Sequence, residues 1–296
     1  MISVPGGAFR MGSEDFYPEE GPITHRTVAS FELDRAPVTN AQFADFVGDT
    51  GYVTVAEIAP DPHFFPDADP TLLVPGSLVF RRTEGPVDLR DWRQWWEWTP
   101  GAQWRHPHGR KSDLIDKAEH PVVQVAFHDA NAYAHWAGKR LPTEDEWEFA
   151  ARGGLDGATF AWGNSAPDRL MANIWQGDFP WRNVGAAGWV GTSPVGSFDP
   201  NGYGLVDMTG NTWEWTAQPW TPRHAPSSIY PGKEGCTCGP ALVGPRRSRV
   251  LKGGSHLCAP EYCLRYRPAA RSQQDEDSAT THIGFRCARS LPVAAA

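Results

Sequence analysis

Apolar residues recur along this chain in short stretches, and their spacing predicts which stretches are strands. Residues 2–12 place apolar side chains on both sides of the Gly6-Gly7 pair. Alternation around a glycine turn predicts two short strands there. Residues 13–26 are polar and contain two prolines, which predicts a loop. The apolar residues at 28, 31 and 33 then predict a further strand.

Three later stretches show helical spacing and recognisable ends. We expect helices over residues 40–50, 129–137 and 144–152. Two of them begin with a capping box, in which a threonine precedes a glutamine or a glutamate by three residues. These pairs are Thr39 with Gln42 and Thr143 with Glu146, and the three expected helices are followed by Gly51, Gly138 and Gly153. In the second helix, Tyr133, Trp136 and Ala137 are expected to face inward.

The rest of the chain shows weaker regularity. Residues 58–118 carry many prolines and are expected to be irregular, with the five tryptophans of residues 92–104 contributing to a core. Residues 120–125 form an apolar run and predict a buried strand. Turns and short strands are expected beyond residue 155. No linker or repeat divides the chain, so a single domain over 1–296 is predicted, with a disordered tail at about 290–296.

Composition and charge narrow the class of protein. Of 296 residues, 30 are glycine and 27 are proline, which is typical of a loop-rich fold. The net charge of −8 argues against binding nucleic acid or anionic lipid, because both need a basic surface. No apolar run has the length of a membrane span, and the N-terminus lacks the pattern of a secretion signal. We therefore expect a cytoplasmic protein without a membrane segment.

Two cysteines, Cys258 and Cys263, lie five positions apart within the sequence GGSHLCAPEYCLRYR. Nearby arginines favour the thiolate form, and two thiolates are soft ligands that prefer Cu(I) or zinc to oxygen-seeking ions. The spacing also permits a disulfide or two inert core residues. Stable disulfides are uncommon in the cytoplasm, which weakens the disulfide alternative.

Several segments together resemble the formylglycine-generating enzyme/sulfatase-modifying family. They are VPGGAFRMGS, APVTNAQFADF, HPVVQVAFHDANAYAHWAGKRLPTEDEWEFAARGG, NGYGLVDMTGNTWEW, LKGGSHLC and HIGFRCA. The resemblance extends from about Val4 to Ala288, and the sequence of these segments is most similar to that of actinobacterial, mycobacterial-type members. It implies an α+β fold of the C-type-lectin-like kind with little regular secondary structure.

The chemistry that the resemblance implies is carried by GGS-x-x-C-x4-C-x-RYR. A member with this motif is expected to oxidise one cysteine in a Cys-x-Pro-x-Arg motif of an unfolded sulfatase polypeptide to Cα-formylglycine. Cys258 and Cys263 are expected to hold Cu(I), with the substrate cysteine as a third thiolate and O2 as the oxidant. Hydrogen abstraction from the substrate Cβ would give a thioaldehyde that water converts to the aldehyde. Electrons are expected to come from an external thiol reductant, since no flavin or nicotinamide motif is present.

Further site residues are carried over from the family by position. Ser255 matches a serine beside the copper site, where a hydroxyl can hydrogen-bond to substrate or to oxygen species. Trp213 matches an aromatic residue that lines this site, although ordinary core packing explains it equally well. Arg265 is a candidate for substrate binding, and Arg265 and Arg267 either lower the pKa of the cysteines or make structural hydrogen bonds.

The resemblance also implies structural calcium, which suits carboxylates and carbonyl oxygens. One set of ligands matches Asp207, Gly210, Thr212 and Glu214. A second set would use Asn173, Ile174 and Trp189, but Ala187 stands where the family has an aspartate. We therefore expect one calcium ion and not two.

The remaining cysteines have no partner in the family motifs. Cys236 and Cys238 lie in a glycine- and proline-rich stretch and are expected to be free thiols, with metal binding or crosslinking as alternatives. Cys287 is expected to be a buried free thiol.

Three other functions remain open from the sequence. A non-catalytic or regulatory domain of the same fold would lack the cysteine pair, which this chain has. A sulfoxide synthase of the ergothioneine type would use iron on a helical domain with grouped histidines, which the sequence does not show. A carbohydrate-binding lectin-like module would not need Cys258 or Cys263. The protein is expected to act as a monomer.

Overall fold

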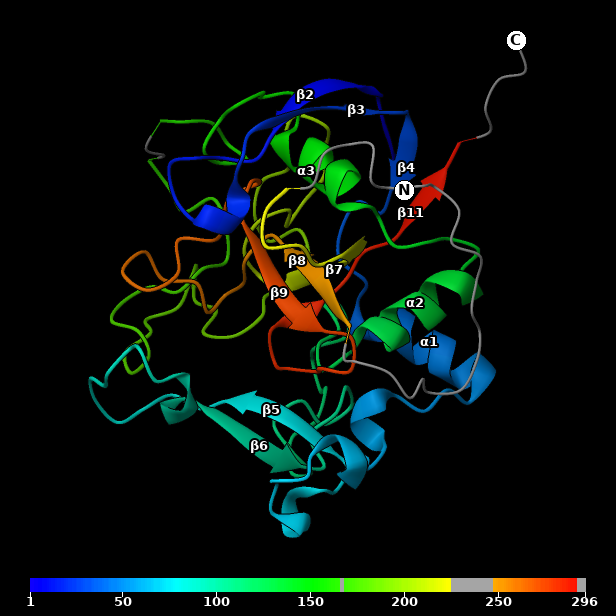
Figure 1. Ribbon diagram of the computed structural model, residues 1–296, viewed down its shortest axis with the longest axis vertical. Coiled ribbons are helices and arrows are strands. Elements are labelled where there is room, and N and C mark those ends of the chain that lie inside the picture. Colours follow the sequence, from blue (N-terminus) through cyan, green and yellow to red (C-terminus); the bar gives the residue numbers. More distant parts are fainter. Residues whose placement is uncertain (166–167, 225–246, 292–296) are drawn as a thin grey trace.

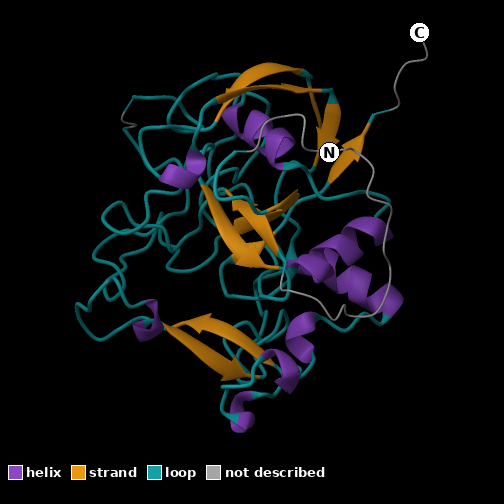
Figure 2. Cartoon of the chain, in the orientation of Figure 1, coloured by secondary structure: helices purple, strands orange, loops and turns teal. Residues whose placement is uncertain are grey.

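Four small β-sheets and three α-helices, joined by long loops, make up the residues that the structure describes (Figures 1 and 2). The computed structural model describes residues 1–165, 168–224 and 247–291. The α-helices are α1 (Asn40–Thr50), α2 (Phe127–Trp136) and α3 (Glu144–Arg152). Short 3-10 helices are η1 (Pro18–Glu20), η2 (Val55–Glu57), η3 (Pro62–Phe64), η4 (Pro70–Leu72) and η5 (Trp92–Gln94). The elements and their loops agree with the predicted α+β class.

The central sheet has the strand order β10-β7-β8-β9. Its strands are β7 (Trp213–Pro219), β8 (Ser248–Lys252), β9 (Arg271–Asp275) and β10 (Ile283–Gly284). The strands β7, β8 and β9 pair antiparallel, and β10 pairs parallel to β7. Helix α3 contacts both this sheet and the β2-β3 ribbon, so it lies between them (Figure 1).

Two smaller sheets form from residues near the two ends of the chain. Strands β1 (Ile2–Val4) and β11 (Ala288–Ser290) both pair with β4 (Phe31–Leu33), and β2 (Gly7–Met11) pairs with β3 (Thr24–Val28). The two strands predicted within residues 2–12 are therefore present, in different sheets. The predicted loop over 13–26 ends earlier than expected, because residues 24–26 pair with β2. The apolar residues at 28–33 belong to two strands rather than one.

The predicted helices are confirmed, with one inward residue and both bounds of α2 corrected, since α2 ends at Trp136 and not at residue 137. Both capping boxes form, and Gly51 and Gly153 adopt the left-handed conformation that ends α1 and α3. Helix α2 begins at Phe127, two residues before the predicted start, and Asp129 accepts a hydrogen bond from the Ala126 backbone N–H. Trp136 was expected to face inward, but it is 40% exposed at the last turn of α2.

The prediction of a buried strand over residues 120–125 is wrong in part. These residues are buried, but no strand forms there. Pro121 has no backbone N–H to donate, and Gln124 has a φ of 62°, which no strand tolerates. The segment is instead held by single hydrogen bonds, from Val122 N–H to Val38 and from Gln124 N–H to Thr280. The apolar spacing of residues 120–125 therefore predicted their burial correctly, but it did not predict their backbone conformation.

Residues 58–118 are less irregular than predicted. Strand β5 (Gly76–Phe80) pairs antiparallel with β6 (Trp96–Pro100), and Figure 1 shows this hairpin apart from the central sheet. The pairing was missed because prolines interrupt the apolar pattern on both sides. The tryptophans of this segment differ in exposure: Trp95 and Trp104 are buried as expected, whereas Trp92 is 50% exposed.

Buried charges support the strand that leads into the cysteine segment. Lys252, the last residue of β8, donates to the carboxylate of Glu148 over 2.9 Å and to the Ala269 carbonyl over 3.2 Å. Arg152 donates to the same carboxylate over 2.7 Å. Burial alone would raise the pKa of Glu148, but the two cations prevail and lower it to about 2. Helix α3 is thus tied to the end of β8 directly before Gly253.

No helix among the described residues combines the length and the apolar character that crossing a bilayer requires.

Candidate active site

Cys258 and Cys263 lie side by side at the wall of a large cavity. Their sulfur atoms are 3.2 Å apart, and both residues are free thiols. A disulfide requires about 2.05 Å, so the pair is close without being bonded. A tight turn brings the second cysteine back, because the Cys263 N–H donates to the Ala259 carbonyl over 2.6 Å. The sequence could not decide between an open pair and a disulfide; the structure has the open pair.

The two thiols differ in their electrostatic surroundings. The hydrogen bond from Cys258 and the nearby Arg265 guanidinium lower the pKa of Cys263. Cys258 is 2% exposed, and burial raises its pKa well above that of an ordinary thiol. Cys263 is therefore the thiol of the pair that loses its proton more readily, because the Cys258 thiol can donate a hydrogen bond to its sulfur. Two sulfur donors side by side at the cavity wall, one of them easier to ionise, are suited to binding a soft metal ion.

Arg265 is held in place from the N-terminal part of the chain. It forms an ion pair with Glu19 over 2.5 Å, and its guanidinium lies 4.1 Å from the centre of the Tyr17 ring. The Tyr17 hydroxyl accepts a hydrogen bond from the Leu264 N–H over 3.1 Å. Arg265 also lines the cavity, so it is placed to act on Cys263 and to face a bound peptide. Sequence reasoning found Arg265 but not Tyr17 or Glu19, since nothing in their local pattern connects them to residue 265.

Backbone geometry explains the glycines before the first cysteine. Gly254 has a φ of +69°, and a Cβ at this position would lie 2.7 Å from the carbonyl oxygen of Arg265. The chain then turns, and the Cys258 N–H donates to the Ser255 carbonyl over 2.9 Å. The Ser255 N–H points to the sulfur of Cys258 at 3.4 Å. Ser255 thus lies beside the thiol pair, where the sequence placed it.

A histidine that the sequence analysis did not single out contacts this serine. Nδ1 of His282 lies 3.1 Å from the hydroxyl oxygen of Ser255. His282 directly precedes β10, and its carbonyl accepts a hydrogen bond from the Trp213 N–H over 2.9 Å. The pairing of β10 with β7 helps to place His282, and although this residue opens the HIGFRCA motif, nothing in that motif connected it with Ser255.

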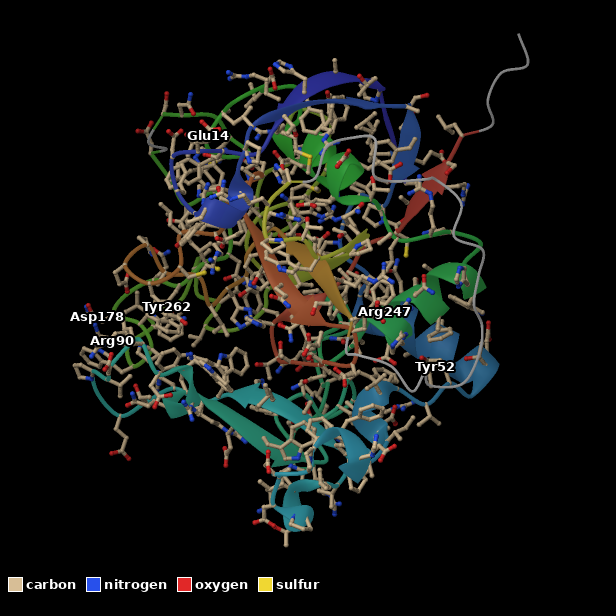
Figure 3. All side chains as sticks on the ribbon, viewed as in Figure 1. Glu14, Tyr52, Arg90, Asp178, Arg247 and Tyr262 are labelled. Atoms are coloured by element: carbon tan, nitrogen blue, oxygen red, sulfur yellow. The ribbon has the colours of Figure 1, made fainter. Side chains whose placement is uncertain are left out.

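The cavity has a volume of about 1990 Å³, far larger than a small ligand needs. Ser255, Cys258 and Cys263 line it, as do Tyr262 and Tyr52, which Figure 3 shows far apart in the view. The cavity is bordered by β5 and β6 on one side and by β9 and α2 on the other; its lining includes Leu78, Trp98, Gln274 and His128. Its size and length suit a stretch of polypeptide.

Aromatic rings line the part of the cavity near the cysteines. Tyr262 stacks on Phe179 with ring centres 4.5 Å apart, and Trp95 meets both rings edge-on. Trp213 is buried with Cys258 in the main core cluster and also lines the cavity. The structure thus gives Trp213 both positions that the sequence left open, as part of the core and as part of the lining.

The predicted calcium ligands Asp207 and Glu214 lie near each other, beside Arg286. Both oxygens of Glu214 accept hydrogen bonds from Arg286 over 2.7 Å, and Oε2 also accepts from Trp147. Burial raises the pKa of Asp207 to about 6, and the nearby Glu214 adds to this effect. Arg286 pairs with the Glu214 carboxylate and donates to the main-chain carbonyl of Asp207, whereas the Asp207 carboxylate accepts a hydrogen bond from the Gly196 N–H. Thr212 adds a buried hydroxyl without a hydrogen-bond partner. This donor set fits a calcium ion.

The second predicted calcium set fits less well. The side-chain oxygen of Asn173 is buried and has no hydrogen-bond partner, which leaves one oxygen ligand available. The Ile174 carbonyl accepts a hydrogen bond from Gln176, and the Trp189 carbonyl accepts one from the Ala186 N–H. None of these residues supplies a carboxylate, and Ala187 stands at the position where the family has an aspartate.

Of the other three cysteines, Cys287 is the one that the described residues include. Cys287 is a buried free thiol, as predicted, and burial raises its pKa well above the ordinary value. Cys236 and Cys238 lie outside the described residues.

Comparisons with known proteins indicate one family. The sulfatase-modifying factor enzyme 1-like domain family matches residues 1–291. A formylglycine-generating enzyme of Mycobacterium tuberculosis (strain ATCC 25618 / H37Rv) is 62% identical, over 97% of this chain and 96% of the relative. A Bos taurus protein named inactive C-alpha-formylglycine-generating enzyme 2 is 40% identical, over 97% of this chain and 87% of the relative. PvdO from Pseudomonas aeruginosa shares the fold, with a TM-score of 0.61 and 24% identity over 98% of this chain and 93% of that chain.

Proposed function

Because the chain belongs to the sulfatase-modifying factor enzyme 1-like domain family, we propose that it is a formylglycine-generating oxidoreductase. Its substrate is a sulfatase polypeptide, and the reaction converts the cysteine of a Cys-x-Pro-x-Arg motif to Cα-formylglycine. The product aldehyde activates the sulfatase. O2 is the electron acceptor, and an external thiol supplies the electrons that complete its reduction.

The observation that carries this proposal is the pair of sulfurs 3.2 Å apart in the wall of a peptide-sized cavity. A core cysteine pair would be sealed from solvent, whereas Cys263 is partly exposed and faces the cavity. A carbohydrate-binding module would not need a thiolate with a depressed pKa at this place. The arrangement therefore favours sulfur chemistry on a polypeptide.

Cys258 and Cys263 are the residues that would hold a copper ion. Their fit rests on three properties of this chain: soft donors, a short separation and one thiol whose pKa is lowered. Cu(I), when bound, would supply the centre at which dioxygen is reduced. The family resemblance favours copper over zinc, since the proposed reaction is a redox reaction and zinc has no redox chemistry.

The chain's own residues bind and orient the substrate. The long cavity holds the polypeptide in an extended form and places its cysteine near the two sulfurs. The stacked rings of Tyr262 and Phe179 supply an apolar wall, and Arg265 sustains the thiolate of Cys263. Water has to reach the site in the last step, because the aldehyde oxygen comes from hydrolysis. A cavity open to solvent allows this.

The direct test is conversion of a short peptide. A peptide with a Cys-x-Pro-x-Arg motif, incubated with the protein, Cu(I), O2 and a thiol, is expected to lose sulfur and gain an aldehyde oxygen. Mass spectrometry before and after aldehyde capture measures this change. A matched peptide with serine in place of cysteine serves as the control and is expected to stay unchanged. Binding of the peptide without conversion under these conditions would contradict the proposal and would place the chain with the non-catalytic members.

A calcium ion at Asp207, Gly210, Thr212 and Glu214 is part of the same proposal. Protein dialysed without chelator is expected to retain one calcium ion per chain, because Asp207 and Glu214 place two carboxylates near each other in a buried environment. Elemental analysis counts the ion. The variant Asp207→Gly removes the carboxylate and suits the local φ of 52°, so it should lose the calcium. Asn173→Ala is the control and should keep it; a count of zero or two in the unmodified chain would refute the single site.

The expected monomeric state and cytoplasmic localisation stay predictions. Neither property enters the chemistry proposed above.

A further inference from the structure

The hydroxyl group of Ser255 is held between a backbone amide and an imidazole ring. Its oxygen accepts a hydrogen bond from the Leu257 N–H over 3.2 Å, and Nδ1 of His282 lies 3.1 Å away. The Ser255 backbone is fixed as well, by hydrogen bonds that its N–H and C=O make with Cys258. The hydroxyl hydrogen of Ser255 can still rotate about the C–O bond, and the contact with His282 restricts this rotation.

A serine hydroxyl has three hydrogen-bonding positions, one donor and two acceptors. Leu257 occupies one acceptor position, and His282 occupies the donor position or the second acceptor position, depending on its tautomer. With either tautomer one position remains free. Ser255 is 0% exposed and, like Cys258, Cys263 and His282, lies in the cavity wall, so a molecule bound against this wall is the partner that we assign to the free position.

His282 is itself firmly positioned. The edge of its ring meets the ring of Trp96, with centres 4.8 Å apart at an angle of 60°, and its carbonyl accepts from the Trp213 N–H. Burial and the neighbouring His256 lower the pKa of His282 to about 3. The imidazole is thus neutral at physiological pH and is too weak a base to take a proton from a thiol. The contact between His282 and Ser255 can therefore orient the hydroxyl group, but it does not transfer a proton.

We propose that His282 is a positioning residue that orients the Ser255 hydroxyl toward the substrate cysteine. This inference rests on the proposed function, since it assumes that the cavity near the sulfur pair receives a cysteine side chain. Through a hydrogen bond from or to the oriented hydroxyl, the substrate sulfur is held next to Cys258 and Cys263. His282 does not touch the reacting atoms; it decides which way Ser255 points.

Two substitutions at residue 282 separate orientation from packing. Asparagine places an amide nitrogen or oxygen close to the position of Nδ1, so His282→Asn preserves a partner for Ser255. His282→Leu keeps bulk and removes the partner. We expect kcat for the peptide to fall about tenfold in His282→Leu, which is the size of one lost hydrogen bond, and to stay within about threefold in His282→Asn. Ser255→Ala is expected to fall at least as far as His282→Leu.

The double variant Ser255→Ala/His282→Leu supplies the decisive comparison. If His282 acts through Ser255, the double variant is no worse than Ser255→Ala, and the two effects are not additive. Peptide binding to the metal-free protein, measured by fluorescence anisotropy, is expected to change less than about twofold in every variant, because most of the cavity is untouched. His25→Leu, at an exposed position of strand β3, is the control and should behave as the unmodified chain.

The outcomes distinguish the two proposals. If the unmodified chain converts no peptide, the proposed function fails. If it converts peptide and His282→Leu does so equally well, if the losses in the double variant add, or if His282→Asn is as poor as His282→Leu, the role of His282 is refuted. Melting temperatures of all variants identify any loss that comes from unfolding, and the His282→Asn and Ser255→Ala variants keep the test valid if His282→Leu does not fold.

Discussion

Replacing Cys258 by alanine is expected to lower peptide conversion by on the order of 10³-fold or more, and Cys263→Ala should do the same. The reason is that the two sulfurs act as a unit, so removing either one disables the whole site. Each variant should also lose tight binding of Cu(I), which titration followed by thiolate absorbance measures independently of turnover. Cys263→Ala removes the thiol whose pKa is lowered, and Cys258→Ala removes the hydrogen bond that lowers it.

Cys287→Ala is the matched control for the cysteine variants. It removes a buried free thiol that does not line the cavity, so conversion and copper binding should stay near those of the unmodified chain. A Cys258→Ala variant with full activity, or a Cys287→Ala variant that loses copper binding, would show that the site lies elsewhere.

Glu20→Gln is expected to lower the free energy of unfolding by about 3–5 kcal/mol, because it leaves Arg267 charged and buried without its counter-ion. The guanidinium of Arg267 is 1% exposed, and two of its nitrogens donate to the two oxygens of Glu20 over 2.5 and 2.8 Å. A third nitrogen donates to the Leu264 carbonyl over 2.7 Å, next to Cys263. The loss should therefore loosen the cysteine segment as well as the N-terminal loop. Urea unfolding measures the change.

Glu19→Gln is the comparison that isolates burial. Glu19 is adjacent in sequence and pairs with Arg265, but both side chains are partly exposed, so the expected loss is at most about 1 kcal/mol. Equal losses in the two variants would mean that burial of the Arg267–Glu20 pair does not determine how much the pair contributes to the free energy of unfolding. A stable Glu20→Gln variant would contradict the structural role given to this pair.

Local features of the sequence predicted local features of the fold. The capping boxes of Thr39 and Thr143 marked the starts of α1 and α3 because a cap involves residues only three positions apart. The same locality made Cys258 and Cys263 a recognisable pair. Strand pairing was predicted less well, since β5 and β6 gain their regularity from each other across a loop of fifteen residues.

The candidate site shows the same division. Ser255 and the two cysteines were identified from one continuous segment, and the family was recognised from motifs spread along the chain. His282, Tyr17 and Glu19 were not identified, because their contacts with residues 255, 264 and 265 bridge from 27 to 247 positions. No spacing rule covers separations of that kind.

The sequence by itself determined the ends of α1 and α3, the family and the presence of two soft donors in one short segment. Each of these depends on residues that are close along the chain or on motifs present in the sequence. Only the tertiary structure decided that the sulfurs lie unbonded at a cavity wall, that Cys263 is the cysteine of the pair whose pKa is lowered and that His282 contacts Ser255. Those properties depend on burial and on charges brought together by folding, and neither is a property of a local segment.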